Sequence, residues 1–188
     1  MNDFALDFWT RAPFVFWSAV FFVFGAVVGS FLNVCIHRMP LDLSLAKPGS
    51  QCPKCSFAIP WRLNIPIVSW LWLRGKCRQC AAPISPRYLG VELLTGLAFL
   101  ASWLVFGEQT TPGVLLAVTW GFVLAGLIVA TFIDLEHFII PDQITLGGVA
   151  VGFIVSAALP ALHHLERPAD SLMASGLGIL VGAGSVFA

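Results

Sequence analysis

Two groups of side chains in this sequence have residue types and spacings that could support chemistry. Cys52, Cys55, Cys77 and Cys80 follow the pattern C-x2-C-x21-C-x2-C, and Asp134 stands at the end of the apolar run IVATFI. Two CxxC turns can each aim two thiolates at one tetrahedral zinc ion. An aspartate at the end of an apolar run is either a helix cap or a functional carboxylate, because a charge held in hydrocarbon is costly.

The two cysteine pairs belong to a short internal repeat. The segments CPKCSFAIPWR and CRQCAAPISPR both place Ile four residues and Arg seven residues after the second cysteine. We expect a structural zinc site, because four thiolates leave no open position for substrate or water. A redox-active pair and unliganded cysteines remain alternatives on the spacing alone.

The composition predicts an α-helical polytopic membrane protein. Hydrophobic residues make up 58% of the 188 residues and charged residues 11%, which is more apolar surface than one soluble core of this length could bury. A helix needs roughly 20 apolar residues to cross a bilayer. The expected spans cover residues 13–36, 89–106, 112–133 and 144–162, and a fifth apolar run covers residues 171–188. We therefore expect about five transmembrane helices.

The distribution of positive charge predicts the orientation in the membrane. Eight of the ten Lys and Arg residues lie between the first two spans, namely Arg38, Lys47, Lys54, Arg62, Arg74, Lys76, Arg78 and Arg87. Positively charged loops stay in the cytoplasm, so residues 37–88 are expected there, together with residues 134–143. A reducing cytoplasm disfavours disulfides between the four cysteines. A cleaved signal peptide is disfavoured, because Asp3 and Asp7 precede the first span.

The expected organisation has three parts. Residues 1–36 form an external N-terminus and the first transmembrane helix, residues 37–88 a cytoplasmic zinc-binding loop domain, and residues 89–188 the remaining transmembrane core. The basic loop should repel basic peptides. We expect it to lie against anionic lipid headgroups instead, and we expect no nucleic-acid partner.

Three stretches together resemble the prepilin peptidases, the polytopic leader peptidases of type IV pili and type II secretion. They are GSFLNVCIHRMP at residues 29–40, the paired CxxC motifs around NIPIVS at residues 64–69, and FIDLEHFIIPD at residues 132–142. The resemblance runs in the same order from about residue 20 to residue 150.

This resemblance implies an aspartyl endopeptidase of the bacterial inner membrane. It would cut the basic leader from prepilins and pseudopilins at the cytoplasmic face. Many members also N-methylate the new N-terminus with S-adenosylmethionine. No glycine-rich GxGxxG fingerprint supports that cofactor here, so the methyltransferase activity rests on the resemblance alone.

The family uses two catalytic aspartates. Asp134 matches the first, and the second belongs to a GxGD motif that these residues lack. Asp142 follows Pro141 at an expected helix start, where it would be an N-cap. Glu136 is expected in the turn after Asp134 and points to another side of a helix. Neither is expected to replace the missing aspartate, although Asp134, Glu136 and Asp142 together could attract a basic leader.

The final apolar run also bears on function. It has no Lys, Arg, Trp or Tyr between Ser171 and Ala188, which is expected of a chain truncated at its C-terminus. A truncated chain with one catalytic aspartate should be inactive as a peptidase. The alternative function is a non-catalytic, zinc-bearing assembly factor of the pilus or secretion machinery, which the missing GxGD favours and the motif around Asp134 disfavours.

The orientation can be tested by cysteine labelling in intact cells. A cysteine introduced into the 37–88 loop should not react with a membrane-impermeant thiol reagent until the cells are opened, because the positive charges hold that loop inside. Rapid labelling in intact cells would reverse the topology and remove the argument for a reducing environment.

Overall fold

The computed structural model of this chain describes residues 9–187, which form helices and connecting turns without any β-strand. The helices are α2 (Phe14–Arg38), α3 (Val68–Trp72), α4 (Pro86–Phe106), α5 (Thr111–His137), α6 (Asp142–Ala158) and α7 (Pro168–Phe187), with 3-10 turns η1 (Met39–Leu41), η2 (Trp61–Leu63) and η3 (Pro160–His163). The expected external segment at residues 1–8 and the last residue, Ala188, lie outside the described part. The predicted α-helical membrane architecture is confirmed.

Three helices among the described residues are long and apolar enough to cross a membrane. They cover Phe14–Leu41, Pro86–Phe106 and Thr111–His137. Helix α6 is apolar but has only 17 residues, which is at the lower limit for a span. The predicted total of about five spans therefore stays a prediction.

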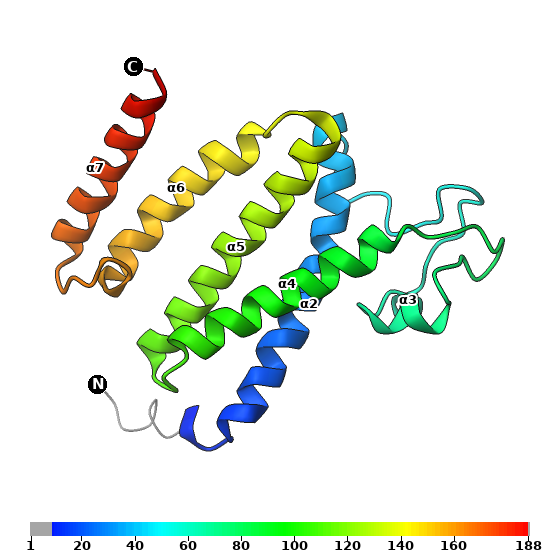
Figure 1. Cartoon of the computed structure of the whole chain (residues 1–188), viewed down its shortest axis with the longest axis horizontal. Coiled ribbons are helices and arrows are strands. Elements are labelled where there is room, and N and C mark those ends of the chain that lie inside the picture. Colours follow the sequence, from blue (N-terminus) through cyan, green and yellow to red (C-terminus); the bar gives the residue numbers. More distant parts are fainter. Residues whose placement is uncertain (1–8, 188) are drawn as a thin grey trace.

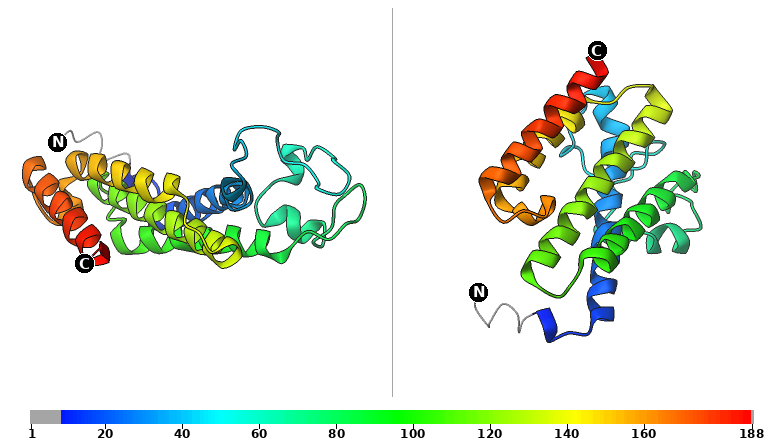
Figure 2. Two further views of the ribbon diagram at one scale, coloured as in Figure 1. Left: turned by 90° about the horizontal axis from the view of Figure 1, so that it is seen from above. Right: turned by 60° about the vertical axis from the view of Figure 1, so that its left-hand side comes forward.

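Helices α2, α4 and α5 pack together as the body of the molecule (Figure 1). Helices α6 and α7 form a pair on one side of α5. The segment between η1 and α4, residues 42–85, which we call the cysteine lobe, projects from the opposite end, as the two further views also show (Figure 2). The lobe contains α3 and all four cysteines of the CxxC pairs.

Glycines allow α2 and α4 to touch along their backbones. A Cβ atom built on Gly25 would lie 2.7 Å from the Phe99 Cβ, and one built on Gly29 would lie 2.8 Å from the Glu92 Cα. Small residues four apart on a membrane helix permit this approach, which gains van der Waals contact where no hydrophobic effect operates. The Asn33 side-chain amide reinforces it by donating from α2 to the Tyr88 carbonyl, at 3.1 Å.

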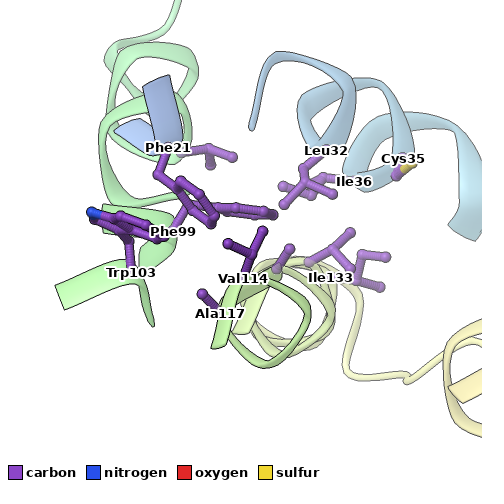
Figure 3. Packing of buried hydrophobic residues seen from close by; sticks show 12 residues of the cluster. Phe21, Leu32, Cys35, Ile36, Phe99, Trp103, Val114, Ala117 and Ile133 are labelled. Carbon is purple, nitrogen blue, oxygen red and sulfur yellow. The ribbon is translucent and has the colours of Figure 1, made fainter. Parts of the chain in front are cut away.

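Aromatic side chains fill the centre of the three-helix body (Figure 3). Phe99 of α4 is fully buried and lies against α5, where a Cβ on Gly121 would come within 2.7 Å of its ring. The Trp103 ring stacks on Phe14 and Phe21 of α2, with centroid distances of 5.2 and 4.7 Å. These contacts fix the helices that lead to and from the cysteine lobe.

Helix α5 is longer than the sequence predicted. The apolar run ends at Ile133, but the helix continues to His137, so Glu136 lies in its last turn and the prediction that it occupies a turn after Asp134 is wrong. Polar side chains do not end a helix, since the backbone N–H groups of these residues still bond to carbonyls one turn earlier. The end comes at Phe138, which has φ 57° and donates its N–H to the Asp134 carbonyl at 2.8 Å.

The prediction that Asp142 is an N-cap is also wrong. Pro141 occupies that position with an extended backbone, and no side chain caps the start of α6. Asp142 is instead the first residue within the helix. Its charge there is favourable because the N-terminal end of a helix carries a partial positive charge.

The glycine contact gives a stability prediction. Gly29→Ala places a methyl group against the backbone of α4, so the helices must separate, which should destabilise the protein by about 1–3 kcal/mol. Gly90→Ala is the matched control, because a Cβ on Gly90 meets no atom within 4 Å. Thermal unfolding in detergent measures both variants. Equal stability of the two would contradict the close approach of α2 to α4.

Candidate metal centre and carboxylate site

The cysteine lobe contains two copies of one turn, as the sequence repeat predicted. In the first copy the Cys52 N–H donates to the Phe57 carbonyl at 3.0 Å. In the second copy the Cys77 N–H donates to the Ala82 carbonyl at 2.8 Å. The residues in these bonds are five apart in both copies, so each CxxC segment closes in the same tight turn and turns both of its thiols to one side.

The two turns bring the four thiols together. All four Sγ atoms lie within 4.8 Å of one another, with Cys52 to Cys80 at 3.8 Å and Cys55 to Cys77 at 3.9 Å. Four sulfurs bound to one zinc ion at about 2.3 Å are separated by roughly 3.8 Å, the edge of the tetrahedron. The cluster could therefore hold a metal ion, and its dimensions are compatible with zinc.

The short contacts within this cluster, Cys52 to Cys80 and Cys55 to Cys77, run between the two CxxC segments. Four of the five cysteines of the chain belong to it. The fifth, Cys35, is buried in the last turn of α2 and is not part of the cluster.

The electrostatics of the cluster also suit a cation. Hydrogen bonds from the backbone of Lys54 and Cys55 lower the pKa of Cys52 to about 6, so its thiolate is available at neutral pH. A backbone hydrogen bond at Phe57 acts in the same direction on Cys55, but burial and the neighbouring thiols outweigh it and raise the pKa of Cys55 to about 12. The thiols cannot all ionise side by side unless a cation lies between them.

Glu92 ties the cysteine lobe to the helical body. It lies within α4, its side chain is buried, and its Oε2 accepts the Ile67 N–H at 2.7 Å. Ile67 immediately precedes α3. The sequence analysis missed this residue, although a carboxylate inside an expected span is itself a signal of a specific role.

Asp134 lies in the last turn of α5 with its side chain exposed. Residues three, four or seven apart share a helix face, so Leu127 and Thr131 lie on the same face as Asp134. An open apolar groove of about 260 Å³ between α4 and α5 follows this face and is lined by Leu94, Ala98, Leu124, Leu127, Ile128, Thr131 and Phe132. Asp134 therefore stands one turn beyond the end of an apolar surface.

The other two acidic candidates have different surroundings. The Glu136 carboxylate forms an ion pair with Arg87 at the start of α4. The Asp142 side chain is exposed at the start of α6. Arg87 was not selected from the sequence as a functional residue, and its recurrence seven residues after a second cysteine was the one available signal.

Comparison with known proteins accounts for most of the chain. Residues 23–106, which include α4 and the cysteine lobe, match the model of the bacterial peptidase A24 N-terminal domain. Residues 121–188, which include Asp134, match the model of the type IV leader peptidase family. The chain belongs to the type IV leader peptidase family. The resemblance to prepilin peptidases found in the sequence is thereby confirmed.

Characterised relatives of this leader peptidase family agree with the assignment. The chain is 44% identical over 165 residues to the prepilin leader peptidase/N-methyltransferase of Myxococcus xanthus (strain DK1622), covering 86% of this chain and 46% of the relative. It is 42% identical over 176 residues to the type 4 prepilin-like proteins leader peptide-processing enzyme of Escherichia coli O78:H11 (strain H10407 / ETEC), covering 84% and 61%.

The chain thus spans about half the length of the curated relatives it matches. No solved structure matches it.

Proposed function

We propose that the protein is an aspartyl endopeptidase that removes the leader peptide from type IV prepilins and type II secretion pseudopilins. The observation that carries this proposal is the exposed carboxylate of Asp134 on the last turn of α5, within the region matched to the leader peptidase family. The names of the relatives support prepilins as substrates.

The proposed chemistry requires a second carboxylate. Hydrolysis without a covalent intermediate needs one carboxylate to take a proton from water and another, protonated, to polarise the scissile carbonyl. Two adjacent carboxylates share one proton because both cannot readily ionise, and they titrate as a pair. We assign Asp134 to this pair and expect its partner to come from the GxGD motif of the family rather than from Glu136 or Asp142.

Charge complementarity supports a contact between the leader and the end of α5. Asp134, Glu136 and Asp142 all have exposed side chains near the turn between α5 and α6, and the leaders of this family are basic. One carboxylate oxygen of Glu136 binds Arg87, which leaves the other for a basic side chain of the substrate. We propose these three residues as the leader-binding surface.

We also propose that the protein resides in the bacterial inner membrane with the cysteine lobe in the cytoplasm and against lipid. Support for the lipid contact comes from Trp61 and Trp72, which are 77% and 81% exposed on the lobe, because indole rings favour the headgroup region. In the labelling experiment described above, a cysteine at residue 72 should then react more slowly in opened cells than one at Arg78, because lipid headgroups would cover it. Equal rates would exclude this contact.

The four cysteines are proposed to bind one structural zinc ion, which when bound would cross-link the two turns. The spacing of the sulfurs and the crossed contacts between the turns support this. Residues 37–88 would then be a metal-stabilised unit between the first two spans. We propose methylation of the new N-terminus with S-adenosylmethionine as a second activity. The name of the Myxococcus relative supports this proposal.

Metal content gives the first test. Protein purified under reducing conditions should contain about one zinc per chain, and replacing both Cys52 and Cys77 by Ser should abolish it, because two of the four ligands are lost. Cys35→Ala is the control, since Cys35 lies outside the cluster and its loss should leave the zinc content unchanged. Elemental analysis that finds no zinc in the reduced parent protein would refute the site.

Leader cleavage gives the second test. Expressed from its complete reading frame with a full-length prepilin, Asp134→Asn should lower cleavage by at least about 10²-fold, because the shape is kept and the titratable carboxylate is lost. Asp142→Asn should be much milder, since Asp142 takes no part in the proposed proton transfer and its loss removes one of three leader-binding charges and a favourable charge from the first turn of α6. Mass spectrometry of the product measures cleavage and N-methylation together. Equal loss in the two variants would mean that these roles are wrongly assigned.

A further inference from the structure

The ion pair between Arg87 and Glu136 joins two helix ends that meet beside the cysteine lobe. Arg87 lies in the first turn of α4 and Glu136 in the last turn of α5. The Arg87 Nη1 donates to the Glu136 Oε1, and the two side chains are 21% and 39% exposed.

Each of these charges stands at the unfavourable end of its own helix. The N-terminal end of a helix carries a partial positive charge and the C-terminal end a partial negative charge. An arginine in the first turn of α4 and a glutamate in the last turn of α5 are therefore both disfavoured by the helix that carries them. Their pairing compensates for both, so the arrangement serves the contact between the helices rather than either helix alone.

On one side, the pair is attached directly to the second cysteine turn. Arg87 is the seventh residue after Cys80. The backbone between them is held because the Ile84 N–H donates to the Gly75 carbonyl at 2.7 Å and the Ser85 hydroxyl accepts the Arg87 N–H at 3.3 Å. Arg87 therefore has little freedom to move relative to the turn that supplies two of the four thiols.

On the other side, the pair acts on the helical turn that carries Asp134. Glu136 follows Asp134 by two residues, and α5 ends one residue after it, at His137. The residues beyond are exposed, with Phe138 at 87%, so little packing restrains this end. Terminal turns of helices fray readily. The ion pair is thus a restraint that reaches the Asp134 turn from outside α5.

We propose that Arg87 is a positioning residue that couples the cysteine lobe to Asp134. By holding Glu136, it keeps the last turn of α5 helical and fixes the direction in which the Asp134 carboxylate points. The metal-binding turn would then have a role in catalysis without touching the substrate. This inference rests on the proposed peptidase function.

The repeat supplies a matched control for this proposal. Arg62 is the seventh residue after Cys55 and so occupies in the first turn the position that Arg87 has in the second. The Arg62 side chain is exposed. The ion pair with Glu136 is formed by Arg87, from the second turn of the repeat. Arg62→Gln removes the same charge from the same place in the repeat.

The test is a kinetic comparison in the protein expressed from its complete reading frame and purified into lipid. Arg87→Gln should lower kcat for prepilin cleavage about 10-fold to 100-fold with little change in KM, because a misplaced catalytic group slows chemistry more than binding. Arg87→Lys should retain more activity. Exchanging the charges, with Arg87→Glu and Glu136→Arg together, should restore kcat, because the pair is remade and each charge then suits its helix end.

Four outcomes would overturn the coupling. Three concern kcat: an unchanged value in Arg87→Gln, an equal loss in Arg62→Gln, and no recovery in the exchanged pair. The fourth is an effect of Arg87→Gln on KM alone, which would make Glu136 a leader-binding residue only. Thermal unfolding of each variant separates misfolding from mispositioning, and the exchanged pair is the variant expected to fold best. The proposed peptidase function fails separately, through full activity of Asp134→Asn.

Discussion

The contact of α2 with α4 at Gly25 and Gly29 is the constraint on which the other parts depend. Because the two backbones touch there, the end of α2 and the start of α4 have a fixed separation and direction. The cysteine lobe begins at one of these ends and finishes at the other. Its entry is held by Arg38, whose guanidinium donates to the Ser44 and Pro48 carbonyls at 2.9 and 2.7 Å, and its interior by Glu92. The cysteine cluster is therefore built on a rigid frame.

Features that depend on short stretches of sequence were predictable. Apolar length gave the helices of the body, and the repeated spacing gave the cysteine cluster, because a CxxC turn is closed by bonds within itself. The ends of helices were less predictable. The apolar run stops at Ile133, but the left-handed conformation that ends α5 belongs to Phe138, a residue type with no preference for it. The start of α6 was misjudged because Pro141 supplies the extended backbone that Asp142 was expected to supply.

Contacts between helices could not be predicted from the sequence, because they depend on how the helices cross. Glu136 and Arg87 are 49 residues apart, and Glu92 and Ile67 are 25 apart. Nothing in the local pattern says which basic residue of the loop meets Glu136, since eight are available. The position of Asp134 at the end of the apolar surface was foreseen, whereas the restraint on its turn was not.

The two cysteine turns share a design but face different surroundings. After the first, the chain enters the short turn η2 with Trp61 exposed; after the second, it enters α4 through Pro86 and Arg87. Sequence change after the first turn alters only an outer surface, whereas change after the second alters how a membrane helix starts. A duplicated unit of this kind allows evolution to vary one copy while the other copy keeps the helices in register.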